Sequence, residues 1–232
     1  MKYLFSFFLL LPLVTYSQTD IEKAEKLFVK QKYVEAQPLF EALYIQDPKN
    51  CKVIEYLGDI QGHQQNWDAA LHYYKTLKIM KPNEADYYYK YGGVLGMIAK
   101  DSNKFKALGM IADIRTSFEK AIQLNPKHID ARWALIELYL QLPGIVGGSE
   151  SKAISYSDQL YKISPVDGYL SKGKIAEYFN RYTDAEIQYK KAIDTGSSKV
   201  GYQKLAALYK NKMKQPEKAK LILAELNEKN KS

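Results

Sequence analysis

The sequence predicts an all-α fold, a solenoid built from about six similar helix pairs. A small residue followed four positions later by an aromatic or apolar one recurs along the chain, with some substitutions: Ala36/Phe40, Ala70/Tyr74, Ile114/Phe118, Ala153/Ser157, Ala185/Tyr189 and Ala219/Leu223. The first two units lie 34 residues apart (70 minus 36), as do the last two (219 minus 185). A fixed period of this length is typical of stacked helical hairpins.

The two helices of each unit can be placed by small residues and prolines. Twelve residues before the marked position stand small residues that allow a tight helix crossing: Ala24, Gly58, Gly173 and Ala207, and Gly92 when ten inserted residues are allowed. Twelve residues after it stand Pro48, Pro82, Pro126 and Pro165, which cannot continue a helix. The expected repeats are therefore 18–50, 51–84, 85–128, 129–165, 166–199 and 200–232.

The middle of the array departs from the period. Ala70 and Ile114 are 44 residues apart, which is ten too many, and Ile114 and Ala153 are 39 apart, which is five too many. The first excess falls within 96–107 and predicts two lengthened helices joined near 100–104. The second forms the Pro/Gly-rich loop 142–149, with Ser149 as the expected N-cap of the next helix. Such insertions frequently carry the function of a repeat protein.

The pattern resembles the tetratricopeptide repeat (TPR) family over nearly all of the chain after residue 17. The second repeat carries it most clearly, with Leu57-Gly58 in its first helix, Ala70, Tyr74 and Leu77 in its second, and Pro82 at its end. The resemblance implies a right-handed superhelix that binds a protein or peptide in a groove lined by the first helices. Carried over by repeat position, the groove residues are Lys52, Glu55, Asp59, His63, Tyr89, Gly93, Met97, Trp133, Glu137, Lys174, Tyr178 and Lys204.

Two aromatic residues of this set are the preferred anchors for a ligand. Trp133 and Tyr178 are large side chains on an otherwise polar surface, where such residues contribute most to binding. For Trp133, packing between repeats is an equally good interpretation. For Tyr89, which lies near Gly93 and Gly96, the two interpretations are packing against the second helix of its own repeat and contact with an extended peptide. Glycines inside a helix are unfavourable, so Gly92, Gly93 and Gly96 indicate a close neighbour.

The first residues predict export. A lysine at position 2, an apolar run over 4–14 and small residues near position 17 are typical of a secretory signal peptide, residues 1–17. The apolar run is too short to span a bilayer as a helix. We therefore expect a periplasmic or secreted protein that begins near Gln18. The single cysteine, Cys51, allows no intramolecular disulfide and is best interpreted as a small buried residue at a helix start.

The positive charge is concentrated at one end. The chain carries a formal net charge of +8, and from 199 to 232 nine lysines face three glutamates, a local +6. A terminal repeat needs a polar outer face, which is the simpler explanation. Nucleic acid is an unfavoured partner, because the lysines are not interleaved with aromatic residues.

No motif predicts catalysis, a cofactor or a metal. The loop 144–149 lacks the Lys-Ser/Thr pair of a phosphate-binding loop, and Ser149 to Lys152 spells S-x-x-K without its partner motifs. The three histidines have no paired ligand spacing. We expect a non-enzymatic binding scaffold or adaptor. The alternatives are a structural envelope component that docks peripherally on anionic lipid or polymer through its basic last repeat, and a hydrolase using the Gly-rich insertion.

Overall fold

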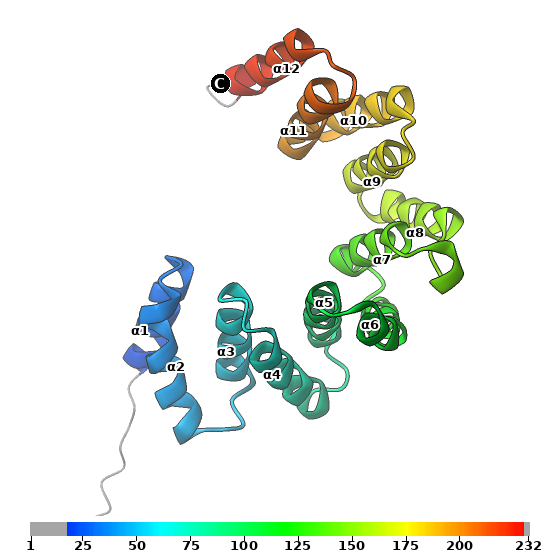
Figure 1. The fold of residues 1–232 in the computed structure, drawn as a ribbon. Coiled ribbons are helices and arrows are strands. Elements are labelled where there is room, and N and C mark those ends of the chain that lie inside the picture. The colour runs from blue at the N-terminus through cyan, green and yellow to red at the C-terminus, as the bar shows by residue number, and fades with distance from the viewer. Residues whose placement is uncertain (1–17, 230–232) are drawn as a thin grey trace, which may run out of the picture. The chain divides into compact units, whose positions relative to one another are not determined.

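The computed structural model describes residues 18–229, and these form helices and turns without any strand. The expected signal peptide, 1–17, lies outside this range. The helices are α1 (Gln18–Val29), α2 (Tyr33–Gln46), α3 (Cys51–His63), α4 (Trp67–Met80), α5 (Ala85–Asp101), α6 (Lys104–Leu124), α7 (Ile129–Gln141), α8 (Glu150–Ile163), α9 (Pro165–Tyr178), α10 (Tyr182–Gly196), α11 (Lys199–Ala207) and α12 (Pro216–Lys229). They follow one another as six consecutive pairs, so the expected all-α fold of about six helix pairs is confirmed (Figure 1).

The chain divides into two compact units, and the division between Tyr73 and Tyr74 falls inside α4. The core of the first unit lies between α1, α2 and α3. Its fully buried side chains include Ala24, Phe40, Leu57 and Ile60. In the second unit, the last four helices share a core that contains Tyr189, Tyr202 and Leu205, each almost completely buried.

The expected tight crossings are present at Gly173 and Gly92. A Cβ added to Gly173 on α9 would lie 2.4 Å from the Tyr189 ring on α10, and one added to Gly92 on α5 would lie 3.0 Å from the Phe118 ring on α6. The glycines therefore let an aromatic ring of the second helix lie directly on the backbone of the first. Gly93 and Gly96 differ, because nothing lies within 4 Å of their added Cβ atoms. The expectation of a close neighbour was wrong for these two.

Three of the turns inside helix pairs have the same geometry. Gln31, Gln65 and Asn180 adopt positive φ angles of 59°, 62° and 59°. The residue after each donates its backbone N–H to the carbonyl five positions back: Lys32 to Leu27, Asn66 to Gln61 and Arg181 to Ala176. This is the Schellman ending of a helix, in which a left-handed residue lets the last carbonyls be satisfied as the chain reverses.

The turn between α11 and α12 contains one more residue than the three turns just described. After α11 the chain forms a π-helical turn, η2 (Leu208–Lys212), and the N–H of Gln215 bonds to Tyr209 six positions back. The expected small residue of this first helix, Ala207, is exposed, whereas Ala206 is buried. The prediction was wrong by one position because a π turn holds one more residue than an α turn.

The prolines end the second helices as expected. α2, α4, α6 and α8 each stop two residues before a proline, and Pro165 is itself the first residue of α9. Proline suits the first helical position, where its missing N–H is not needed.

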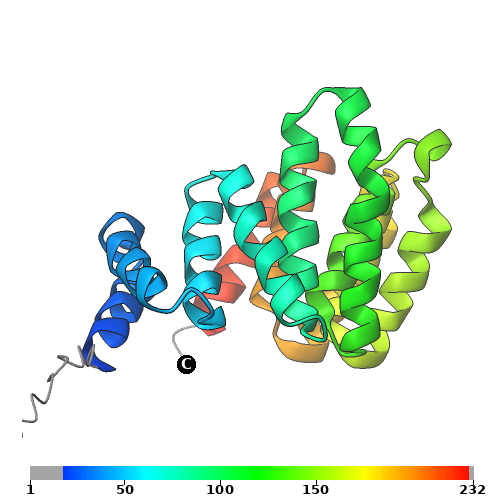
Figure 2. The ribbon, with the colours of Figure 1, turned by 90° about the horizontal axis from the view of Figure 1, so that it is seen from below.

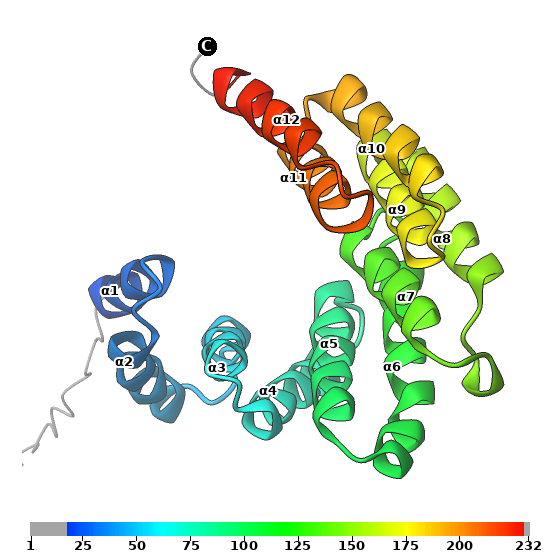
Figure 3. The same cartoon turned by 45° about the horizontal axis from the view of Figure 1, so that its top comes forward.

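The two insertions have different structures. The first lengthens α5 to 17 residues and α6 to 21, and only Ser102 and Asn103 separate them. In Figure 2 this hairpin extends beyond the helices that follow it in the chain. The second is the loop between α7 and α8, which contains the short 3-10 helix η1 (Gly144–Val146) and Gly147 at φ 104°. Figure 3 shows this loop set off from the ends of α7 and α8, and Ser149 caps α8 as expected by accepting the N–H of Lys152.

Within residues 18–229, no helix is both long and apolar enough to cross a membrane.

Candidate functional site

A shallow pocket in the second unit joins three consecutive first helices. It has a volume of about 200 Å³ and is lined by one or two residues from each of α7, α9 and α11: Trp133, Leu170, Lys174, Val200 and Lys204. Three of these, Trp133, Lys174 and Lys204, belong to the set of groove residues expected from the sequence. The structure therefore brings part of that set together on one surface, which we call the α7–α9–α11 strip.

Trp133 is held in a fixed position in this strip. Its indole Nε1–H donates to Oδ1 of Asp167 at 2.9 Å, and Oδ2 of the same carboxylate accepts from the Ser164 hydroxyl at 2.6 Å. The ring also packs against the core that lies between α9, α10, α11 and α12. Trp133 thus packs against the next repeat, as one interpretation expected, and it also lines the pocket.

Charged and apolar side chains alternate along the rim of the strip. Lys174 forms an ion pair with Glu137 across α9 and α7. Val200 is 48% exposed and lies in the pocket wall, and Lys204 is exposed beside it. Tyr178, the second expected anchor, is 48% exposed at the end of α9, where its ring meets Phe179 edge to face at 5.1 Å. Tyr178 does not line the pocket that contains Trp133.

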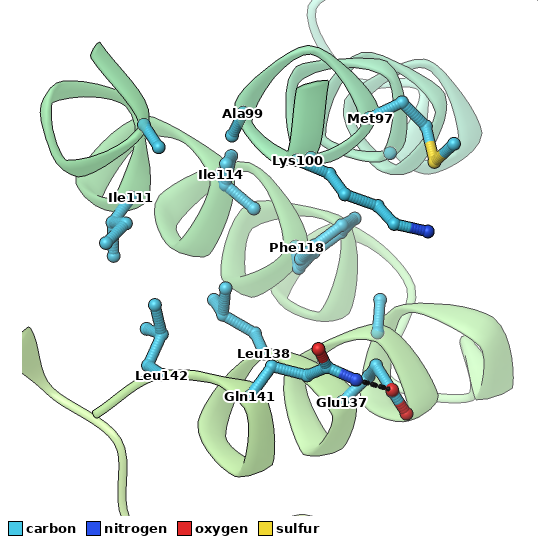
Figure 4. A pocket seen from close by; sticks show the side chains of 14 residues that line it. Met97, Ala99, Lys100, Ile111, Ile114, Phe118, Glu137, Leu138, Gln141 and Leu142 are labelled. Carbon is cyan, nitrogen blue, oxygen red and sulfur yellow. Dashed lines mark hydrogen bonds between the residues drawn. The ribbon is translucent and has the colours of Figure 1, made fainter. Parts of the chain in front are cut away.

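A larger pocket lies between α5, α6 and α7. Its volume is about 490 Å³, and its lining includes the expected groove residues Gly93, Met97 and Glu137. Figure 4 shows Ile114, Phe118 and Leu138 pointing into it from α6 and α7, with Ile111 and Leu142 at one end. Towards the other end, Lys100 on α5 lies across the pocket from Glu137 and Gln141 on α7, and Gln141 Nε2 donates to Glu137 Oε1 at 2.6 Å. The pocket is thus apolar at one end and polar at the other.

The expected groove residues of the first unit lie on α3. Lys52 forms a 2.6 Å ion pair with Glu25 on α1, and this hydrogen bond, with the carboxylate charge, raises the pKa of Lys52. His63 stacks on Tyr33 with ring centroids 4.3 Å apart. Glu55 and Asp59 are half-buried on the same helix and have interactions of their own. The partners of Lys52 and His63 therefore belong to the same unit as these residues.

Tyr89 packs against its own and the next repeat. Its ring lies 6.0 Å from that of Phe118 on α6 and 5.1 Å from that of His128, which caps α7. Burial, followed by the charges of Asp130 and Asp86, raises the pKa of Tyr89. These contacts support the packing interpretation of Tyr89.

Some lining residues were not found from the sequence. Leu170 stands at the same repeat position as Trp133 and Lys204, so the repeat register contained the signal to find it. Val200 lies at the first position of its unit, which the register does not select. Lys100 lies in the insertion, where no repeat position is defined. Cys51, expected to be buried at a helix start, begins α3 but is only half-buried.

Among residues 18–229, no three side chains of the His, Cys, Asp and Glu types gather in a way that could hold a metal ion. Ser149, the residue of the S-x-x-K sequence, shares a 3.0 Å hydrogen bond with the Ser151 hydroxyl and caps α8. Its observed role is therefore that of a helix cap.

Comparisons with known proteins agree with this architecture. The model of a family described as the plant-specific mitochondrial import receptor subunit TOM20 matches residues 67–163, less than half of the chain. No curated protein matches the sequence.

Several solved structures have a similar fold. A thermophilic TPR protein of Thermus thermophilus has a TM-score of 0.67 at 17% identity, covering 82% of this chain and 97% of that one. PilW, a type IV pilus biogenesis factor, has a TM-score of 0.66 at 17% identity, covering 90% and 93%. YrrB, described as a TPR protein with an unusual peptide-binding site, has a TM-score of 0.53 at 16% identity, covering 78% and 87%. At these identities the likeness concerns the fold.

Proposed function

We propose that this chain, which has the fold of the tetratricopeptide-repeat proteins, is a non-enzymatic scaffold or adaptor that binds a peptide or protein segment on the α7–α9–α11 strip. The observation that carries the proposal is the pocket shared by three first helices, with a fixed tryptophan in its wall. A repeat array leaves such an extended surface available because each repeat buries its apolar side chains only against its neighbours. The peptide-binding site described for the similarly folded YrrB supports the proposal.

The strip favours a ligand of defined chemistry. Trp133, Leu170 and Val200 offer an apolar lining, and Lys204 adds a positive charge beside it. The hydrogen bond to Asp167 fixes the indole before any ligand arrives, so little side-chain entropy is lost on binding. A large apolar residue with an acidic neighbour fits this surface, because the first fills the pocket and the second pairs with Lys204.

Peptide selection tests the proposal without a known partner. A random peptide library is selected on the purified protein, and the retained peptides are expected to carry an aromatic or aliphatic residue next to Asp or Glu. Val200→Asp combined with Lys204→Glu should weaken the selected peptides by at least about tenfold, since one lost contact of about 1.4 kcal/mol has that effect. Both residues are exposed, so the fold should be retained.

Lys210→Glu is the matched control, because Lys210 is an exposed lysine on η2 outside the pocket. Peptide affinity should be unchanged in this variant. The proposal is wrong if no peptide is retained, or if the double variant binds the selected peptides as well as the unchanged protein does.

Export to the periplasm or the medium is part of the proposal and rests on the sequence of residues 1–17. Expression with a carboxyl-terminal tag, followed by fractionation and amino-terminal sequencing, is expected to find a cleaved protein beginning near Gln18 outside the cytoplasm. Uncleaved protein in the cytoplasm would contradict export and leave the binding proposal intact.

A further inference from the structure

The first insertion supplies part of the lining of the pocket between α5, α6 and α7. Gly96, Met97, Ala99, Lys100 and Ala107 all belong to the segment that exceeds the repeat period, and all line the pocket. Leu142, at the start of the second insertion, closes one end (Figure 4). The two departures from the regular repeat therefore meet at one place.

Two glycines keep the pocket open. Gly93 and Gly96 lie inside α5, where glycine is less favourable than alanine. Gly92 has a packing reason, since Phe118 lies against it, but the space beside Gly93 and Gly96 is empty to at least 4 Å. Any larger residue at these two positions would project its side chain into the pocket, so their effect is to preserve its volume.

The size and lining suit a small molecule. Ligand pockets have volumes of about 300–1,000 Å³ and are mostly apolar with a few polar groups. This pocket, at about 490 Å³, has walls formed by Ile114, Phe118 and Leu138. A ligand that fills it must have a substantial apolar body.

The polar end defines the head group of the ligand. Glu137 is engaged by the ammonium of Lys174 and by the amide of Gln141. In the described part of the chain, Lys100 has neither a hydrogen bond nor an ion pair, and its side chain is exposed at the pocket. Glu137 is thus already paired with Lys174, which lines the other pocket, and the ammonium of Lys100 is left to pair with a ligand. This favours an anionic head group.

We propose that this pocket binds an amphipathic monocarboxylate of the medium-chain fatty-acid class, with the aliphatic chain between α6 and α7 and the carboxylate paired with Lys100. The site has a different lining from the α7–α9–α11 strip, and the ion pair between Lys174 and Glu137 lies between the two.

Calorimetric titration with three probes of the same chain length tests the head group. Decanoate should bind, decanol should bind at least about tenfold more weakly because it cannot pair with Lys100, and decyltrimethylammonium should bind most weakly. Equal affinity for decanoate and decanol, or no binding of decanoate, overturns the proposal. Val200→Asp with Lys204→Glu should leave decanoate binding unchanged, which separates this test from that of peptide binding.

Matched variants test the location. Gly96→Leu fills the pocket and should abolish decanoate binding while the melting temperature stays level or rises, since nothing lies near the added Cβ. Gly109→Leu is the control, because Gly109 is also without a neighbour within 4 Å but lies outside the pocket. The Gly109→Leu protein should bind decanoate normally.

Lys100→Gln should reduce the affinity for decanoate to that for decanol. Lys104→Gln, across the turn from Lys100, should leave the affinity for decanoate unchanged. Normal binding by Gly96→Leu overturns the site.

Discussion

Single glycines in this protein have opposite roles, and the contacts of an added Cβ distinguish them. At Gly173 the neighbour is the buried ring of Tyr189, whose hydroxyl donates to Glu177 at 2.9 Å. The ring is nearly fully buried and hydrogen-bonded, so it cannot easily move aside. At Gly109 the helix backbone is exposed and no neighbour lies within 4 Å. The first glycine permits the packing of two helices, and the second only weakens its helix.

Alanine at these two positions should therefore change stability in opposite directions. Gly173→Ala is expected to lower the free energy of unfolding by about 1–3 kcal/mol, because overpacking forces the ring or backbone to shift. Gly109→Ala is expected to raise it by about 0.5–1 kcal/mol through reduced freedom of the unfolded chain. Urea unfolding followed by circular dichroism measures both. A stabilised Gly173→Ala protein would show that α9 and α10 do not cross as closely as described.

At the scale of helices and turns, the repeats fall into regular and irregular kinds. The pairs α1/α2, α3/α4 and α9/α10 share the Schellman turn with one left-handed residue. The pair α5/α6 replaces it with the short turn at Ser102 and Asn103, where the Asn103 side chain accepts the N–H of Lys106. The pair α7/α8 uses the longer loop that contains Gly147. The larger pocket is lined by α5, α6 and α7, which belong to the two irregular pairs. The smaller pocket is lined by α7, from an irregular pair, and by α9 and α11, which follow it.

The regular turn can be improved with glycine. Gln65 adopts φ 62°, a conformation that is unfavourable for a residue with a side chain and neutral for glycine. Gln65→Gly is expected to raise the free energy of unfolding by roughly 0.5–1 kcal/mol, the strain relieved less the added freedom of the unfolded chain. Asn180→Gly should gain less, because asparagine tolerates this conformation better than glutamine.

Gln64→Gly is the control for this prediction. Gln64 precedes the left-handed residue and has φ −83°, where glycine relieves no strain. Glycine there adds freedom to the unfolded chain and removes the side-chain hydrogen bonds that join Gln64 to Gln37 and Asn66. This variant should be less stable than the unchanged protein in the same thermal unfolding experiment. If Gln64→Gly and Gln65→Gly behave alike, the turn does not have the described geometry.

The sequence predicted most helix ends and missed features that depend on single residues. Prolines two residues after α2, α4, α6 and α8 made those ends predictable, because proline excludes the helix from its position. Ala207 was placed one position wrong, since no residue type marks the π turn that holds the additional residue. Gly93 and Gly96 look like Gly92 in sequence. Only the direction of each position on α5 decides whether it lies against the Phe118 ring, as Gly92 does, or beside the empty space of the pocket, as Gly93 and Gly96 do.

At the scale of the whole chain, charge is unevenly distributed. Six of the eight net positive charges lie in 199–232. The strip contains two lysines, Lys174 and Lys204, and the larger pocket contains Lys100, each beside apolar side chains. Two of the terminal lysines pair with carboxylates one helical turn away, Lys220 with Glu217 and Lys229 with Glu225, and these pairs are exposed. Exposed pairs contribute little and are weakened by salt. We therefore expect the basic end to act as a diffuse positive surface rather than as a specific site.

A diffuse surface of this kind should bind anionic vesicles only while salt is low. Sedimentation with vesicles rich in phosphatidylserine is expected to show binding at low ionic strength and none in about 1 M salt, where the screening length is about 3 Å. Lys212→Glu with Lys218→Glu should weaken binding by about tenfold or more, because each basic residue near such a surface contributes about 1 kcal/mol. Lys26→Glu with Lys30→Glu, on exposed positions of the first unit, is the matched control and should have a smaller effect.

The same variants separate the two candidate functions. If the strip is the functional surface, Lys212→Glu with Lys218→Glu should bind the selected peptides normally, because neither residue lines its pocket. Vesicle binding that persists in 1 M salt, or that survives both charge reversals, would show that a specific site and not the summed charge holds the membrane. Loss of peptide binding in this variant would instead place the peptide along α12, and the strip would no longer explain it.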